Sequence, residues 1–241
     1  MRRSRRHFLA AATALSVVLI PACSSGPAGG SSPVPDPSTS AQATARLLAP
    51  GKTAGFQVLR ANVPGKPVKA QPFAPPHGSL DHVCTFLSSP SYFTPSPSAG
   101  AGESFALPRQ QQRQYLPLPP SWFEWIDAYP GTEAAGIVRA LPALIGKCGH
   151  FVFANGAIGS VRIPAREAAV PLPGYGSQAL YVSVRLMSGV PGKFWADDWI
   201  VIRSDRTLIF IDGQYVRPIR TAQDRMTLQL AREAWQHYSA A

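Results

Sequence analysis

Two cysteines and two histidines are the residues of this chain with the clearest potential for chemistry. They occur as His82-Val83-Cys84 and Cys148-Gly149-His150, so that each cysteine stands two residues from a histidine. Two thiolates and two imidazoles can bind zinc tetrahedrally, but structural zinc sites usually take closely spaced cysteine pairs, which this chain lacks. The same cysteines could form a disulfide or remain free thiols, and all three states stay open at this point.

A third cysteine, Cys23, ends an N-terminal segment with the features of an export signal. Four arginines precede an uncharged apolar run of 13 residues, from Phe8 to Ile20. A membrane-spanning helix needs roughly 20 residues, and this run has the shorter length of a signal-peptide core. The ending Ile20-Pro21-Ala22-Cys23 resembles the bacterial lipobox, in which the thiol is lipidated and the cysteine becomes the new N-terminus. The alternative is an ordinary secretory signal with a cysteine near its cleavage site.

The arginines also indicate an export route. Arg5 and Arg6, followed after one residue by Phe8 and Leu9, resemble the twin-arginine signal, which carries folded proteins. Lipidation of Cys23 would leave the other two cysteines as an even pair in an oxidising compartment, which favours a disulfide over zinc or free thiols. A disulfide that closes a loop of about 65 residues stabilises a fold by roughly 4 kcal/mol.

The chain then divides into a spacer and one domain. Residues 24–44 are rich in Ser, Pro, Gly and Ala, and such a composition buries too little surface to offset its chain entropy. We therefore expect a signal peptide at 1–22, a lipidated cysteine with a disordered linker at 23–45, and a folded domain at 46–241. A lipoprotein anchor, with palmitate or similar acyl chains, would hold this domain at the extracytoplasmic face of the cell membrane.

The charge of the chain depends strongly on this signal. The net charge of +10 falls to +6 once the four N-terminal arginines are removed. The remaining Lys and Arg are scattered singly, which suits an ordinary surface with some contact to anionic lipid or cell-wall polymer. No nucleic-acid-binding motif occurs, and we expect no nucleic-acid partner.

The domain has the pattern of an α+β protein, an antiparallel sheet packed against helices. Strands are expected on both sides of an Asn155-Gly156 turn, at 179–187, at 198–203 and 207–211 around a turn at 204–206, and at 214–217 after an Asp212-Gly213 turn. Short turns between consecutive strands indicate an antiparallel meander.

Three helical segments are expected. One covers 132–148, where Pro142 predicts a kink or two short helices, and another lies around 80–88. The last begins with Thr221 as its N-cap and carries an apolar stripe that predicts docking on the sheet. The stripe consists of Met226, Leu230, Ala234 and Tyr238, widened by Ala231 and Trp235.

Aromatic residues gather near two Pro-rich segments, 89–98 and 107–120. The second segment runs into Trp122-Phe123-Glu124-Trp125, and a further tryptophan, Trp195, precedes Asp197-Asp198. Exposed aromatics often mark a binding surface, so Trp122, Trp125 and Trp195 are candidate ligand-binding residues. The alternative is that these rings cap the core beneath a loop.

No enzyme motif supports catalysis. The chain has no Gly-x-Ser-x-Gly elbow, no His-Glu-x-x-His and no phosphate-binding loop, and we expect neither an enzyme nor a cofactor. Asp81-His82 reads as surface or structural, and Asp197-Asp198 reads as a solvated turn at a strand entrance.

The order of elements resembles a known family. After the spacer come Arg46-Leu47-Leu48-Ala49-Pro50-Gly51, then Val83-Cys84-Thr85-Phe86-Leu87, then a helix ending in Cys148-Gly149-His150-Phe151, a meander and a closing helix. This order resembles twin-arginine-exported actinobacterial lipoproteins whose mature part is similar to the extracytoplasmic sensor domain of the mycobacterial serine/threonine kinase H. The resemblance implies an α+β sandwich, a disulfide between Cys84 and Cys148, and a cleft for an unidentified ligand.

The expected function is a non-catalytic cell-envelope lipoprotein that presents a sensor-like or ligand-binding domain. Its expected partners are the membrane, through the N-terminal lipid, and an unknown small molecule, lipid or cell-wall ligand. The alternative is a lipoprotein that carries lipid or glycolipid in an apolar cavity.

Overall fold

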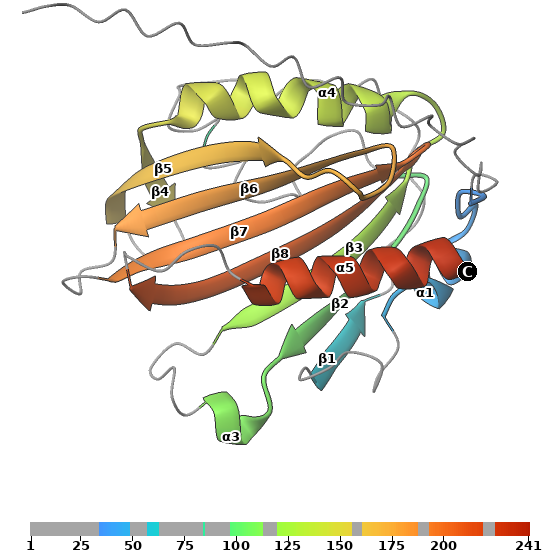
Figure 1. The fold of residues 1–241 in the computed structure, drawn as a ribbon, viewed down its shortest axis with the longest axis horizontal. Coiled ribbons are helices and arrows are strands. Elements are labelled where there is room, and N and C mark those ends of the chain that lie inside the picture. The colour runs from blue at the N-terminus through green and yellow to red at the C-terminus, as the bar shows by residue number, and fades with distance from the viewer. Residues whose placement is uncertain are drawn as a thin grey trace, which may run out of the picture. The chain divides into compact units, whose positions relative to one another are not determined.

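The computed structural model describes residues 34–48, 57–62, 84, 97–112, 120–155, 161–187, 193–218 and 225–241. Its centre is one eight-stranded antiparallel sheet in the order β1-β2-β3-β8-β7-β6-β5-β4 (Figure 1). The strands are β1 (Gln57–Asn62), β2 (Ala99–Ala106), β3 (Ser121–Ala128), β4 (Phe151–Asn155), β5 (Val161–Pro171), β6 (Gln178–Met187), β7 (Lys193–Ser204) and β8 (Thr207–Pro218).

Two antiparallel meanders make this sheet. Strands β4 to β8 pair with their neighbours in chain order, as do β1 to β3, and the two sets join where β3 pairs with β8. The chain leaves β3 through a helix and re-enters the sheet at its far edge, β4. The predicted α+β class, an antiparallel sheet packed against helices in a single domain, is confirmed.

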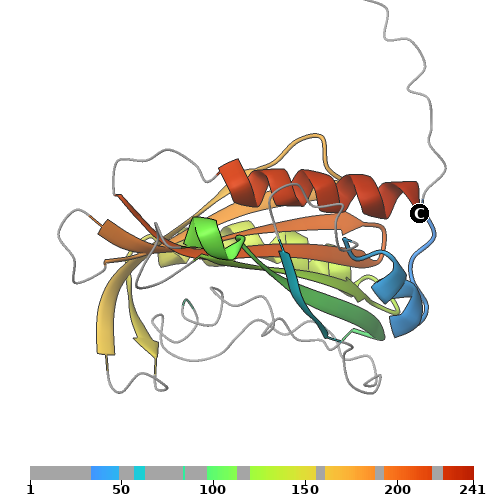
Figure 2. The same ribbon diagram turned by 90° about the horizontal axis from the view of Figure 1, so that it is seen from below.

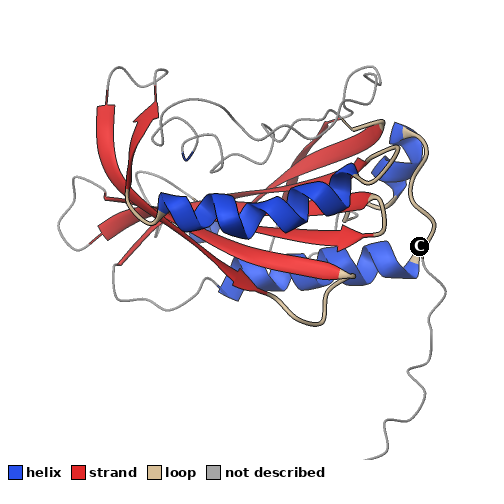
Figure 3. Cartoon of the chain, turned by 90° about the horizontal axis from the view of Figure 1, so that it is seen from above, coloured by secondary structure: helices blue, strands red, loops and turns tan. Residues whose placement is uncertain are grey.

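Helices cover both faces of the sheet. They are α1 (Ser40–Ala45), α3 (Arg109–Gln112), α4 (Glu133–Ile145), which continues into a 3-10 turn at Gly146–Cys148, and α5 (Arg225–Ala240). α4 packs on one face, and α1 and α5 pack on the other (Figures 1 and 2). Figure 3 shows the two long helices, with α4 nearer the viewer than the strands and α5 beyond them. We refer to these as the α4-side and the α5-side of the sheet.

The predicted stripe of the last helix forms the α5-side core. Leu230, Ala234 and Tyr238 are fully buried, and Met226 is partly buried against the same core. The C-terminal end of α5 lies beside α1 (Figure 1), where the guanidinium of Arg46 sits 4.8 Å from the centre of the Tyr238 ring. The predicted N-cap, Thr221, lies outside the described residues.

The α4-side core confirms the predicted face of β6. Leu180, Val182, Val184 and Leu186 alternate onto this side and pack with the buried side chains of α4. α4 runs through Pro142 as one helix, with Pro142 on its exposed side, so the chain is not divided into two short helices there. The other predicted helix, at 80–88, lies outside the described residues except for Cys84, which is helical.

The folded domain begins earlier than predicted. Residues 40–45, expected in the linker, form α1, and the compact unit starts at Pro33. Two sets of contacts explain why this segment belongs to the folded domain. Thr39 caps α1 by accepting a hydrogen bond from the Gln42 backbone N–H. The Asp36 carboxylate then ties this segment to the β7–β8 turn, because it accepts hydrogen bonds from Thr207 Oγ1 at 2.6 Å and from Arg206 Nε at 3.1 Å.

The predicted Asp212-Gly213 turn is wrong, because β8 continues through both residues to Pro218. Gly213 instead allows α5 and the Trp122 ring to pack closely against β8. A side chain there would collide with Thr227 Oγ1 of α5 and lie 2.8 Å from Trp122 Nε1. Asn155 pairs with Val161, and the rest of the predicted Asn155-Gly156 turn lies outside the described residues. The predicted turn at 204–206 is confirmed, with Ser204 paired to Thr207.

Candidate functional site

Six carboxyl groups of the described residues are buried in the middle of the sheet, three on each face. Their burial contradicts the prediction that Asp197-Asp198 forms a solvated turn, since both lie within β7 and are at most 9% exposed. Side chains alternate along a strand, so the strand positions assign each carboxyl to a face. The α4-side cluster is Glu167, Asp197 and Asp212, and the α5-side group is Glu103, Glu124 and Asp198.

Asp197 and Asp212 form a proton-sharing pair on neighbouring strands. Asp197 is cross-strand from Gln214, two residues beyond Asp212 on β8, so the two aspartates are diagonal neighbours. Burial raises the pKa of Asp197 well above its usual value, and the nearby carboxyls of Asp212, Asp198 and Glu167 raise it further. Burial also raises the pKa of Asp212 to about 6, although hydrogen bonds from Asp197 and Gln214 limit the rise. Asp197 is therefore the protonated donor of the pair and Asp212 the acceptor.

Glu167 faces this pair from β5 without a hydrogen-bond partner of its own. Its side chain is 4% exposed, and neither of its carboxyl oxygens has a hydrogen-bond partner. Only Val184 of β6 separates it from Asp197 in the cross-strand row. Burial raises the pKa of Glu167 to about 8. A buried polar group without a partner destabilises a fold by a few kcal/mol, so Glu167 is the most unusual member of the cluster.

Aromatic rings flank the same carboxyls. Asp212 is cross-strand from Phe123 of β3 on one side and from Trp199 of β7 on the other. The Phe123 ring stacks on that of Trp125, with centroids 5.3 Å apart, and both residues are half-buried. Gly102 of β2 leaves room for Trp125, whose ring atom Nε1 would lie 2.9 Å from an added side-chain carbon. The carboxyls of the α4-side cluster are thus buried beside aromatic rings, of which Phe123 and Trp125 keep part of their surface exposed.

The α5-side carboxyls have partners within the protein. Glu103 and Glu124 face each other across β2 and β3, and Glu124 Oε2 accepts a hydrogen bond from the Leu48 backbone N–H at 3.1 Å. Burial raises the pKa of Glu103 to about 7, and its hydrogen bond with Glu124 limits the rise. Asp198 accepts a 2.7 Å hydrogen bond from the Tyr181 hydroxyl. These bonds tie the segment after α1 to β3, and tie β6 to β7, which is a structural role.

The three tryptophans predicted to bind a ligand do not share one surface. Trp125 lies on the α4-side beside the carboxyl cluster. Trp195 occupies a β7 position with the same parity as Asp197, which places it in the neighbouring row of that face. Trp122 lies on the α5-side, is 1% exposed, and donates a hydrogen bond from Nε1 to Thr227 Oγ1 at 3.1 Å. The structure therefore brings two of the three positions to the carboxyl cluster.

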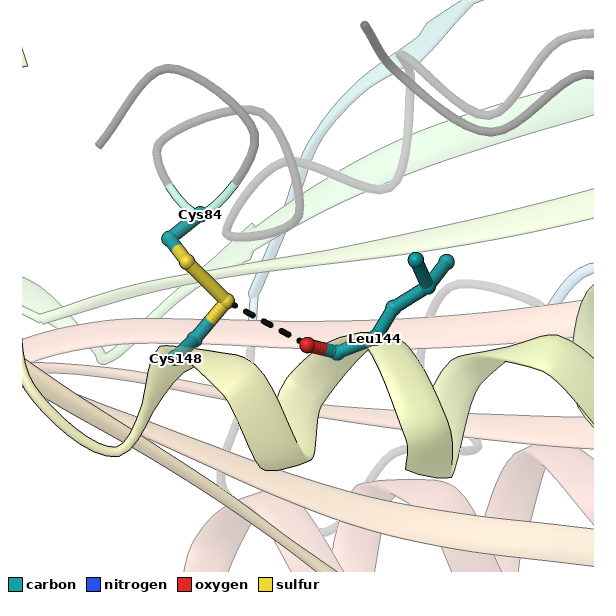
Figure 4. The surroundings of a disulfide bond; sticks show 3 residues. All are labelled: Cys84, Leu144 and Cys148. Carbon is teal, nitrogen blue, oxygen red and sulfur yellow. Dashed lines mark hydrogen bonds between the residues drawn. A yellow bond between two sulfur atoms is a disulfide. The ribbon is translucent and has the colours of Figure 1, made fainter. Parts of the chain in front are cut away.

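The predicted disulfide between Cys84 and Cys148 is confirmed, with Cα atoms 5.6 Å apart (Figure 4). It joins residues 64 positions apart and ties the Cys84 segment to the end of α4. Cys148 Sγ lies 3.5 Å from the Leu144 carbonyl oxygen, a contact between helical neighbours. Both cysteines are fully buried and belong to the α4-side core.

The disulfide uses the two thiols on which the alternative zinc site depended. His150 is exposed, and His82 lies outside the described residues. Within the described ranges, no group of three or more Asp, Glu, His or Cys side chains is placed to hold a metal ion. The export and lipidation residues, Arg5, Arg6, Phe8, Leu9 and Cys23, lie outside the described residues. No described helix is long and apolar enough to cross a membrane.

Sequence reasoning missed the carboxyl cluster, although the sequence holds a signal for it. On β7, Asp197 lies on the same face as the apolar residues Trp199 and Val201. On β8, Asp212 likewise shares a face with Phe210 and Leu208. An acidic residue at the inward positions of an otherwise apolar strand is a buried carboxyl, not a turn residue. Glu167 carries a weaker signal, because its strand is only moderately apolar.

Comparisons with known proteins agree with this fold. No protein-family model matches the chain, and no curated protein sequence matches it. Among solved structures, the chain is similar to the crystal structure of the extracellular domain of PknH from Mycobacterium tuberculosis, with a TM-score of 0.54 and 12% sequence identity. The match covers 88% of this chain and 100% of that domain. The expected resemblance to that kinase's extracytoplasmic domain therefore holds at the level of the fold.

Proposed function

We propose that this chain is a non-catalytic lipoprotein of the cell envelope that presents a sensor-like, ligand-binding domain outside the cytoplasmic membrane. The observation that carries the proposal is the likeness in fold to an extracellular domain over that domain's whole length. The Cys84–Cys148 disulfide supports the same location, because disulfides persist in oxidising compartments.

The N-terminal sequence supplies the anchor in this proposal. Arg5 and Arg6 direct export, and the thiol of Cys23 receives the lipid. Because the domain begins at Pro33, the tether from Cys23 is about ten residues long and spans at most about 35 Å.

The α4-side cluster is the proposed ligand site. Its carboxyls and half-buried aromatic rings offer hydrogen bonds and stacking surfaces, which is the mixture found in small-molecule sites. Glycoside hydrolysis needs two carboxyls about 5 Å or more apart on either side of a bond. Asp197 and Asp212 instead bond directly to each other, so the geometry favours binding over that reaction.

The alternative function, a lipid carrier, requires an apolar chamber. The described apolar side chains instead pack into two continuous cores, one beneath α4 and one beneath α1 and α5. We therefore keep ligand binding as the proposal.

Membrane fractionation tests the anchor directly. The full chain should partition with the membrane fraction of its host, and its N-terminal peptide should carry diacylglycerol at Cys23 by mass spectrometry. Cys23→Ser should move the protein to the soluble extracytoplasmic fraction, whereas the matched control Ser24→Ala should stay with the membrane. Replacing Arg5 and Arg6 together by lysine should retain the uncleaved protein in the cytoplasm. A Cys23→Ser protein that remains membrane-bound would overturn the lipid anchor.

A further inference from the structure

We propose that the α4-side cluster of Glu167, Asp197 and Asp212 binds an organic ammonium group. The inference deepens the proposed function, since it names the ligand class of a site that the ligand-binding proposal already assumes. It rests on the unpartnered Glu167 carboxyl, on the aromatic rings beside Asp212, and on the contrast with the α5-side carboxyls.

Glu167 provides the first reason. Its carboxyl is 4% exposed and has no hydrogen-bond partner, while Asp197 and Asp212 lie on the same face. Ionisation of three buried carboxyls in one place is strongly disfavoured unless an opposite charge compensates them. A bound cation supplies that charge, and an ammonium group also donates hydrogen bonds to oxygens that lack donors.

The aromatic residues provide the second reason. Phe123 and Trp199 lie on either side of Asp212 in the cross-strand row, and Trp125 stacks on Phe123. Cations bind favourably over aromatic faces, and carboxylates combined with aromatic rings are the usual recognition elements for ammonium groups. Phe123, Trp125 and Gln214 are half-buried, so they mark the side from which a ligand approaches Asp212.

The third reason is the contrast between the two faces. On the α5-side, the Leu48 backbone N–H bonds one oxygen of Glu124, and the Tyr181 hydroxyl bonds one oxygen of Asp198. On the α4-side, Gln214 donates to Asp212 Oδ2 at 3.2 Å and Asp197 also donates to Asp212, but Glu167 has no partner at either oxygen. Carboxyls with donors built into the fold stabilise structure, whereas carboxyls that lack them fit a ligand that brings its own.

Two other ligand classes fit less well. A divalent metal needs several oxygen ligands converging at short range, and no described group of acidic, histidine or cysteine side chains has that arrangement. A neutral sugar can accept hydrogen bonds and stack on Phe123 and Trp125. It brings no positive charge, so it leaves the ionisation of the buried Glu167 carboxyl as unfavourable as before, whereas a bound cation favours that ionisation.

Calorimetric titration of the full-length protein in detergent tests the inference. The probes are butylammonium, its neutral counterpart butanol, and N-acetylglucosamine. We expect butylammonium to bind at least about tenfold more tightly than butanol. Binding should release protons, seen as a heat that depends on the ionisation enthalpy of the buffer, because the cation favours the ionised carboxyls.

Two isosteric variants make the result specific. Glu167→Gln should weaken butylammonium binding by about tenfold or more, and Asp212→Asn should act in the same direction. Glu103→Gln is the matched control, since it also removes one buried carboxyl, but on the other face. Its affinity for butylammonium should stay within about twofold of that of the unchanged protein. Equal losses in Glu167→Gln and Glu103→Gln would overturn the site.

The remaining outcomes separate this inference from the proposed function. Butanol that binds as tightly as butylammonium, or no binding of butylammonium at all, would overturn the ammonium site. Binding of N-acetylglucosamine alone, lost in Glu167→Gln, would overturn the ammonium class while keeping a ligand-binding function. Failure of the Cys23 experiment would instead remove the membrane anchor and leave the ammonium site standing.

Discussion

Replacing Glu167 by glutamine should change the stability of the domain in a way that depends on pH. The substitution keeps the shape of the side chain but removes its ionisation. Glu167 is 4% exposed and its oxygens lack hydrogen-bond partners, so the folded protein holds the carboxyl in its neutral form. Any loss of packing or hydrogen bonding in Glu167→Gln is the same at every pH, and the difference between two pH values isolates the ionisation.

The sign and size follow from the pKa of Glu167, which burial raises from 4.5 to about 8. Well below pH 4.5 the carboxyl is protonated in both folded and unfolded chains. Between the two values the unfolded chain loses its proton and the folded chain keeps it, so stability falls as the pH rises. The upper limit of this loss is about 5 kcal/mol. We expect about 2 kcal/mol, because relaxation and water penetration lower the penalty of a buried charge.

Urea unfolding monitored by tryptophan fluorescence measures this difference. At each pH, the free energy of unfolding of the unchanged protein is subtracted from that of Glu167→Gln. This difference should be about 2 kcal/mol larger at about pH 8.5 than at about pH 5. Asp205→Asn is the control for loss of one carboxylate, because Asp205 is exposed in the β7–β8 turn and asparagine accepts its φ of 48°. Its effect should be the same at both pH values. If Glu167→Gln also had equal effects at both, the buried-carboxyl reasoning would be refuted.

Three further predictions concern stability, and urea unfolding midpoints measure each of them. Reduction of the disulfide, or Cys148→Ser, should lower the free energy of unfolding by about 4 kcal/mol, and a midpoint that dithiothreitol leaves unchanged would contradict the bond. Gly213→Ala should destabilise by about 2 kcal/mol, because the added carbon would lie 2.8 Å from the Trp122 indole nitrogen. Its control Gly136→Ala, on an open side of α4, should stabilise by up to about 1 kcal/mol; similar midpoints for both variants would disprove the packing argument. Asp36→Ala should destabilise by about 2 kcal/mol through its lost bonds to Thr207 and Arg206, and an unchanged midpoint would place Asp36 outside the folded domain.

The elements that could be predicted are those whose periodicity is unambiguous. The alternation from Leu180 to Leu186 puts these leucine and valine side chains in the core beneath α4, and the helical stripe from Leu230 to Tyr238 packs on the other face; both predictions hold. The disulfide followed from the number of cysteines and from the oxidising compartment that the export signal predicts. α1 was missed because its only buried residue is Ala43, and the segment is held by the long-range bonds of Asp36.

Strands β2 and β3 were missed because neither has a simple alternating pattern. β2 is made largely of small residues, and Gly102 is needed where the Trp125 ring crosses it. β3 pairs with β8 in the middle of the sheet, so Trp122 and Ile126 are buried on one face while Trp125 packs on the core of the other. Only the pairing of distant strands reveals these roles, and a local pattern of proline and aromatic residues resembles a loop instead.

The carboxyl cluster depends on the same long-range pairing of strands. Strand pairing also places neighbouring acidic residues on opposite faces of the sheet, where they have different roles. Asp197 and Asp198 are adjacent on β7 but point to opposite faces. The charge of Asp198 is one cause of the raised pKa of Asp197, so the two faces are electrostatically coupled through the strand. Asp198 is held by the Tyr181 hydroxyl at 2.7 Å, whereas Asp197 shares its proton with Asp212 and faces the unpartnered Glu167. In the proposed ammonium site, a cation beside Asp197 therefore acts on a carboxyl whose ionisation is linked to Asp198, so that binding on one face changes the electrostatics of both.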